Sequence, residues 1–165
     1  MGRIQAIARA IHLLLLGLWV GSGAYHLIVI IPEALSAFSA RQDALGFIGH
    51  GLAKLDLFGQ LAAPALLLSL FIGWAGTGVR LWPRGATIAV LFLAAMLSGR
   101  FLAPDISALE ARMPTLSASD PARLELERLY VAGDGLTIAA VALAALLLMT
   151  SSGSATPRRQ GGIQL

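Results

Sequence analysis

The sequence predicts an all-α fold: an integral membrane antiparallel four-helix bundle, with an amphipathic helix after the first span. Two observations predict it. The 165 residues are 57% hydrophobic and only 13% charged, with a mean hydropathy of +0.78, whereas a soluble domain usually carries about twice that charged fraction. Four apolar runs also approach the length of about 20 residues that a spanning helix needs. The expected surroundings of this chain are therefore a lipid bilayer.

The four spans are separated by polar or glycine-rich connections. We expect them at residues 10–31, 57–79, 85–103 and 135–149. Together they form a single domain of residues 1–150. Pro32 and Pro104 are expected to end the first and third spans, because proline lacks the N–H that continues a helix. The Gly- and Ser-rich residues 151–165 predict a flexible tail.

The distribution of Lys and Arg residues predicts the orientation of the chain in the membrane. An even number of spans places both termini on one side of the membrane, together with the connection between the second and third spans. These segments hold six cations and no acid: Arg3, Arg9, Arg80, Arg84, Arg158 and Arg159. Because cytoplasmic loops carry the excess of Lys and Arg, we expect both termini in the cytoplasm. The Ala-, Leu-, Gly- and Arg-rich composition favours a bacterial inner membrane.

The first span also has features of a cleaved signal peptide, namely a cationic start and the small residues GSGA ending at Ala24. However, the apolar run continues through LIVII and reaches spanning length. A retained span is therefore the favoured interpretation.

Two connections on the other side predict further helix. Residues 36–55 have apolar side chains at helical spacing, and Ser39 with Gln42 matches a capping box. This amphipathic helix is expected to lie on the membrane or to continue into the second span. Asp120 as N-cap and Pro121 at the first helical position predict a helix that runs unbroken into the fourth span.

Small residues recur where helices should meet. Gly17 and Gly21 form a GxxxG pair, and Gly73, Gly76 and Gly78 crowd the end of the second span. Because such residues let helix backbones approach closely in membranes, they predict a compact bundle.

The three histidines are the first candidates for chemistry. His12 and His26 lie fourteen residues apart on one helix, within roughly 40° of each other and about 21 Å apart along its axis. His12 is either a heme or copper ligand or an interfacial or packing residue, and the second interpretation is favoured. His26 is deeper and needs a partner. His50 lies on the same side of the membrane and could meet it.

No cofactor is expected, with heme b or copper as the alternative. Two stacked bis-histidine hemes need four histidines, and the chain has three. One heme through His26 and His50 stays open. Copper would suit histidine with methionine, but the four methionines form no cluster. The absence of cysteine excludes disulfides, iron–sulfur clusters and thiolate zinc sites, and the scattered cations exclude a nucleic-acid partner.

Further polar residues lie near the outer ends of the spans. Arg100 and Asp134 are expected at similar depth, where they either form an ion pair or separately reach water. With His26, Asp56 and Tyr130 they are candidates for an intramembrane polar cluster that opens outward. His50 would line the same pocket. Such a cluster would serve proton transfer, ion binding or plain structural hydrogen bonding.

No enzyme motif is present: the sequence lacks GxSxG, HExxH and a phosphate-binding loop. The expected function is therefore non-enzymatic. It is small-solute handling or an accessory membrane component that forms a homo-oligomer or joins another membrane protein. The alternative is a redox or metal-handling protein that uses the outer histidines.

The first span resembles a known family. The order His12, Trp19, Gly21 and Pro32 in IHLLLLGLWVGSGAYHLIVIIPEAL is similar to the opening span of the transmembrane-protein-205-like family, a domain of unknown function with four spans. FLAPDISALEAR and RLELERLYVAGDGL resemble the family's exit from the third span and entry into the fourth. The resemblance covers about residues 8–150 and implies the four-span architecture without an activity.

The fourth span departs from that pattern. Tyr130 stands where the family leads us to expect histidine, and Gly133 and Thr137 stand where Ser and Asn are expected. The resemblance therefore implies no shared polar site there. A weaker similarity links the early His and W-x-G pattern to copper-resistance-type membrane domains and to the heme-linked protoporphyrinogen-oxidase-like membrane family.

Overall fold

The computed structural model describes residues 2–112 and 120–152, and these are all-α, as predicted. Short π-helices, labelled η, interrupt two of the long helices. The elements are α1 (Gly2–Tyr25), η1 (His26–Ile30), α2 (Ile31–Ala37), α3 (Arg41–Trp74), α4 (Trp82–Leu97), η2 (Ser98–Leu102), α5 (Ala103–Arg112) and α6 (Pro121–Ser152). The predicted tail lies outside the described residues, apart from residues 151 and 152 at the end of α6.

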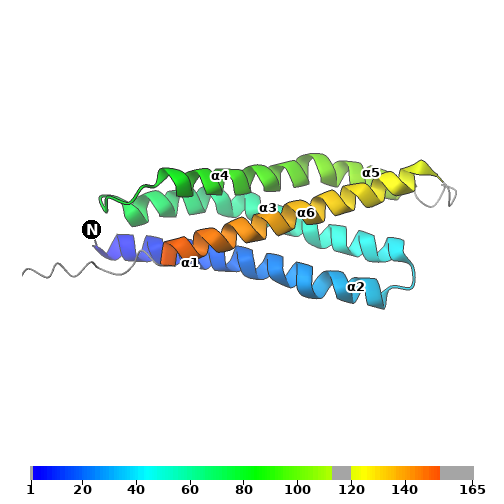
Figure 1. Ribbon diagram of the computed structural model, residues 1–165, viewed down its shortest axis with the longest axis horizontal. Helices are drawn as coiled ribbons and strands as arrows, with labels where there is room; N and C mark the ends of the chain where they lie inside the picture. The colour runs from blue at the N-terminus through cyan, green and yellow to red at the C-terminus, as the bar shows by residue number, and fades with distance from the viewer. Residues whose placement is uncertain (1, 113–119, 153–165) are drawn as a thin grey trace, which may run out of the picture.

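The helices form an antiparallel four-helix bundle (Figure 1). α1 packs against α3 and α6, and α4 packs against the same two helices, so the four close into a ring. In Figure 1, α6 begins beside α5 and ends beside α1, crossing the bundle along its length. Each hairpin therefore contacts the other through both of its long helices.

Among the described residues, four helical segments are long and apolar enough to cross a membrane. They are Gly2–Ala37, Asp43–Trp74, Trp82–Arg112 and Pro121–Ser151. Large apolar side chains cover the outside of the bundle; Leu61 and Val131, for example, are 70% and 71% exposed. An apolar exterior of this kind suits lipid rather than water, as expected for a multi-pass membrane protein.

The prediction that Pro32 and Pro104 end their spans was wrong. Each proline follows a five-residue π-helix, in which the residue before the proline donates its N–H five residues back: Ile31 to the oxygen of His26, and Ala103 to that of Ser98. In a regular α-helix a proline clashes with the carbonyl four residues back and removes its hydrogen bond. The wider π-turn accommodates the proline, so both helices continue beyond it.

The predicted end of the second span at Val79 was also wrong, since α3 ends at Trp74. Gly76 and Gly78 have φ angles of +73° and +70°, in the region that favours glycine. The Thr77 N–H and hydroxyl donate to the Trp74 carbonyl at 3.2 and 2.7 Å. These glycines therefore form the turn instead of packing inside the span.

The two predicted helix starts had different outcomes. The amphipathic residues after the first span do continue into the second, because α3 is unbroken from Arg41. Its N-cap is Ala40 without a side-chain hydrogen bond, so the predicted capping box starting at Ser39 was wrong. The other start is confirmed: the Asp120 carboxylate accepts the Ala122 N–H at 2.9 Å, and α6 runs unbroken from Pro121.

Close helix packing uses glycines other than the predicted pair. Gly17 and Gly21 face outward, and a Cβ added at either would meet nothing within 4 Å. At Gly59, in contrast, a Cβ would lie 2.9 Å from Trp19 Cζ2 and 3.1 Å from Ala95 Cβ. Gly59 therefore brings α3 against both α1 and α4, and the packing role predicted for the GxxxG pair inside the bundle was wrong.

The bundle has a basic half and an acidic half. The basic half comprises residues 2–16, 66–91 and 143–152; the acidic half comprises residues 26–56, 98–112 and 120–137. All nine acidic residues of the sequence belong to the acidic half. The interior of the basic half is closed by fully buried side chains: Leu16, Leu66, Leu70, Ile88 and Leu91.

Candidate functional site

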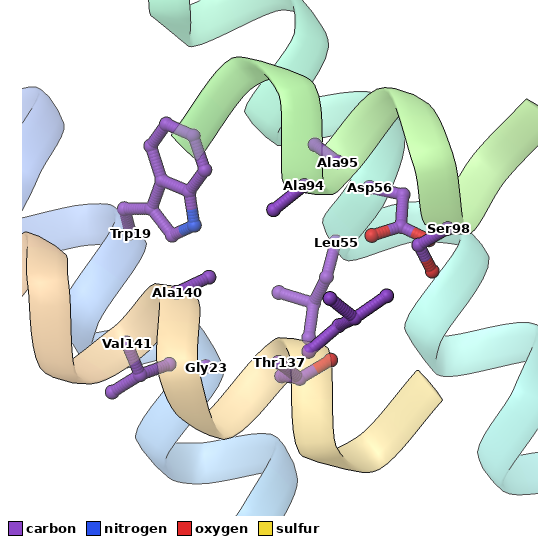
Figure 2. Close-up of a pocket in the computed structure, with 11 residues that line it drawn as sticks. Trp19, Gly23, Leu55, Asp56, Ala94, Ala95, Ser98, Thr137, Ala140 and Val141 are labelled. Atoms are coloured by element: carbon purple, nitrogen blue, oxygen red, sulfur yellow. The ribbon is translucent and has the colours of Figure 1, made fainter. Parts of the chain in front are cut away.

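Asp56 is the most deeply buried acidic side chain that the structure describes, with 9% of its surface exposed. It lies near the middle of α3, within a candidate membrane span. The Ser98 hydroxyl lies next to its carboxyl group, as Figure 2 shows. Ser98 is the first residue of η2. The π-turn before Pro104 is therefore where the partner of Asp56 lies.

Close approach between α3 and η2 depends on a glycine. A Cβ added at Gly99 would lie 2.8 Å from Gln60 Nε2 and 3.6 Å from Asp56 Cβ. The Gln60 side chain in turn donates to the Ala95 carbonyl at 3.2 Å. These contacts fix η2 against the turn of α3 that carries Asp56.

A cavity of about 210 Å³ adjoins Asp56 on the side of α3 that faces η2 and α5. It is lined by α3 residues and by residues of η2 and α5, including Gly46, Gly49, His50, Asp56, Ser98, Ser107 and Glu110. The Tyr130 hydroxyl donates to the Glu110 carboxylate, which ties α6 to this wall. The lining therefore combines two acids and an exposed histidine with small residues.

A second cavity, of about 20 Å³, adjoins Asp56 and Ser98 toward the centre of the bundle. Figure 2 shows its other walls: Trp19 and Gly23 of α1, Ala94 and Ala95 of α4, and Thr137, Ala140 and Val141 of α6. This space suffices for about one water molecule. Asp56 thus lies between the 210 Å³ cavity and the 20 Å³ cavity.

His12 is a fully buried residue that packs between α1 and α3. Its Nδ1 lies 3.2 Å from the Leu66 carbonyl oxygen and 3.1 Å from Ser69 Oγ. Its ring meets Trp74 edge-on, with centroids 5.2 Å apart. Since these contacts join α1 to α3 in the basic half, they agree with the favoured packing interpretation.

The structure does not bring His26 and His50 together. His26 is 3% exposed and lines a cavity between α1–η1 and α3, whereas His50 is exposed and lines the 210 Å³ cavity. His26 instead faces Gly51, where an added Cβ would lie 2.9 Å from its Cε1. The two histidines therefore do not form the axial pair that one heme would need.

Arg100 and Asp134 form no ion pair within the described part of the chain. Arg100 is exposed, and the Oδ1 atom of half-buried Asp134 is buried without a hydrogen-bond partner. Of the predicted cluster, the structure therefore joins Asp56 and, through Glu110, Tyr130 around one cavity that His50 also lines. It leaves His26, Arg100 and Asp134 apart from that cavity.

Sequence reasoning missed Ser98 and Glu110. A signal for Ser98 was present, because it precedes Pro104 by the same six residues that separate His26 from Pro32. For Glu110 there was none, since its partner Tyr130 lies across a connection of unpredictable course. Where the structure is described, it contains no group of three or more His, Cys, Asp or Glu side chains that could hold a metal ion.

Comparisons with known proteins give no family. No family model matches the chain, and no curated protein or solved structure matches it.

Proposed function

We propose that this multi-pass membrane protein binds a proton or a small cation at Asp56, which it takes up from the acidic half of the bundle. The observation that carries the proposal is a buried carboxyl group inside a candidate span with a cavity on either side. An ionisable group in that position is costly unless it is paired or hydrated. Small-solute handling is thus the function class that the site favours.

The partners of Asp56 leave room for a positive charge. Ser98 supplies a neutral hydroxyl, and no lysine or arginine is among the described residues that line either cavity. A carboxylate in such surroundings needs a compensating cation or a proton. The closed interior of the basic half supports binding from one side rather than a continuous pore.

The orientation and family belong to the same proposal. The Arg-rich ends support a cytoplasmic basic half, so that the Asp56 cavity opens to the outside of a bacterial inner membrane. Membership of the transmembrane-protein-205-like family rests on the sequence motifs. The outward-facing Gly17 and Gly21 support a homo-oligomer or another membrane partner.

A lipid-soluble carbodiimide tests the site, because such reagents modify protonated carboxyl groups in apolar surroundings. The protein is reconstituted in phosphatidylcholine nanodiscs, labelled over a range of pH with and without Na⁺, K⁺ or Li⁺, and analysed by peptide mass spectrometry. We expect modification of Asp56 that falls as pH rises, and that falls at fixed pH if one of these ions binds there.

Two variants control the experiment. Asp56→Asn is expected to lose the label, whereas Asp134→Asn, which changes a half-buried acid outside both cavities, is expected to keep it. Labelling of Asp56 that responds to neither pH nor any of the three ions would contradict the proposal and leave Asp56 with a structural hydrogen bond alone. So would an Asp56 that takes no label while Asp134 does.

A further inference from the structure

The 210 Å³ cavity beside Asp56 extends along one face of α3. The α3 residues that line this face are Gly46, Gly49, Ala53 and Asp56. Their spacing of three, four and three residues places them on the same side of a helix. From Gly46 to Asp56 the helix rises about 15 Å. The α3 wall of the cavity is therefore a strip of small residues that ends at a buried carboxyl group.

Glu110 of α5 lies at the other end of this strip. A Cβ added at Gly46 would lie 3.5 Å from Glu110 Oε1, and the half-buried Glu110 side chain is part of the cavity lining. The Tyr130 hydroxyl donates to the Glu110 carboxylate from α6. Gly49 makes room for this ring, since a Cβ there would lie 3.0 Å from Tyr130 Cε1. The fold therefore holds a second carboxylate at a fixed place in the same cavity.

The lining is more exposed toward Glu110 than at Asp56. His50, Ala53 and Ser107 are exposed, whereas Asp56 is 9% exposed. The volume suffices for several water molecules, and the hydroxyl and carboxyl groups of the lining can hydrogen-bond to them. Glu110 thus lies at the open end of a polar cavity, and Asp56 lies at its closed end.

The separation of the two acids bears on the choice between a metal ion and a proton. Oxygen ligands lie about 2.0–2.6 Å from ions such as Mg²⁺ and Ca²⁺. Carboxylates at the two ends of about 15 Å of helix are too far apart to share one ion. Nor does the described part of the chain contain three or more His, Cys, Asp or Glu side chains grouped as metal ligands. A proton, in contrast, needs only one carboxyl oxygen.

We propose that the species bound at Asp56 is a proton, that Glu110 accepts it first at the entrance of the cavity, and that water in the cavity carries it between the two carboxyl groups. The proton leaves a hydronium ion of the solvent and binds a Glu110 oxygen. It then passes along hydrogen-bonded water to Asp56, and Glu110 returns to its carboxylate form. Tyr130 positions Glu110. The relay rests on the proposed binding at Asp56 and specifies its ligand and its entrance.

Infrared spectroscopy after a laser-triggered pH jump measures the transfer. The full chain is placed in nanodiscs of ether-linked phosphatidylcholine, whose lipids have no C=O band. The C=O band of protonated Asp56, identified by its loss in Asp56→Asn, is followed in time. Glu110→Gln keeps an oxygen that accepts from Tyr130 but removes the titratable group. We expect protonation of Asp56 to slow at least about tenfold, with the final amount of protonated Asp56 unchanged.

Four variants sharpen the test. Glu110→Asp keeps a carboxyl group and should restore most of the rate. Ala53→Phe should fill the strip between the two acids and slow the transfer as well, which keeps the test valid if Glu110→Gln fails to fold. Asp105→Asn removes an exposed acid of α5 outside the cavity and should react like the wild type. So should His50→Gln, which removes the remaining titratable side chain of the described lining.

The possible failures of the relay and of the proposed function differ. Equal rates for the wild type and Glu110→Gln, or a lower final amount of protonated Asp56 in that variant, would overturn the entrance role of Glu110 while binding at Asp56 stands. Protection of Asp56 from the carbodiimide by Na⁺, K⁺ or Li⁺ at fixed pH would overturn the choice of a proton. An Asp56 without any pH-dependent band would refute the proposed function itself.

Discussion

The two halves of the bundle treat polar side chains differently. In the basic half, polar side chains reach from one helix to the carbonyl groups of another: Arg9 to Gly73 at 2.6 Å, Gln5 to Ala75 at 3.0 Å and Arg84 to Thr150 at 2.7 Å. In the acidic half, the buried carboxyl group of Asp56 lies between two cavities. Polar side chains at the basic end therefore bond to backbone carbonyls of neighbouring helices, whereas Asp56 borders open space on either side.

The reason lies partly in where helices end. Arg9 and Gln5 satisfy carbonyls at the C-terminal end of α3, where positive charge and N–H donors are favourable. The acidic half contains both π-helices, and such turns are frequent at functional sites. The comparison teaches that the basic half stabilises the bundle, whereas the acidic half carries the proposed binding site.

The largest loss of stability should come from removing the Trp74 side chain in the basic half. The guanidinium carbons of Arg9 and Arg84 lie 5.4 and 5.3 Å from the centroid of this buried ring, which also packs against His12. Trp74→Ala should lower the free energy of unfolding by about 3–5 kcal/mol, measured by SDS titration followed by circular dichroism. Trp82→Ala is the matched control, because Trp82 is 82% exposed; it should change stability by less than about 0.5 kcal/mol. Equal losses of stability for Trp74→Ala and Trp82→Ala would contradict the stabilising role of the basic half.

A smaller effect is expected between the halves, at Gly59. Gly59→Leu forces a side chain against Trp19 and Ala95 and should cost about 1–3 kcal/mol in the same assay. Gly17→Leu adds the same atoms where nothing lies within 4 Å, so the monomer should keep its stability. A comparable loss for Gly17→Leu would show that Gly17 packs against another copy.

The smallest change in stability is expected when a buried polar side chain of either half is replaced by leucine. His12→Leu removes hydrogen bonds that join α1 to α3 and should lower the free energy of unfolding by about 1 kcal/mol. Asp56→Leu removes a costly buried carboxyl group and should leave that free energy unchanged or raise it by about 1 kcal/mol. A larger loss for Asp56→Leu than for His12→Leu would assign Asp56 to the structural framework.

The sequence predicted the architecture well because apolar length is a local property, and the cap at Asp120 was predicted for the same reason. Asp120 and Pro121 specify the start of α6 without help from the rest of the chain. The ends at Pro32 and Pro104 were wrong because a π-turn depends on the packing that holds the helix together beyond the proline.

The site was harder to predict, since it depends on helix rotation. His50 and Gly51 are adjacent in sequence but about 100° apart around α3. Periodicity does not say which of the two faces the first helix. In the structure Gly51 faces the first helix, so His26 packs against the backbone of α3 rather than against a second histidine. Asp56 was recognised as an intramembrane acid, but its partner Ser98 depends on the turn of η2.

The two π-helices also bear on how this chain tolerates changes in length. A π-turn holds one residue more than the α-turn that it replaces, so the flanking segments keep their faces while the extra residue bulges out. Deleting a residue elsewhere in a span would turn every later side chain by about 100°. Within His26–Ile30 or Ser98–Leu102 the same deletion can be absorbed by return to α-helical bonding if the following proline is replaced as well, because the wider turn is what accommodates the proline. These two turns are thus the places in the first and third spans where one residue can be lost, together with the proline, while the packing on both sides survives.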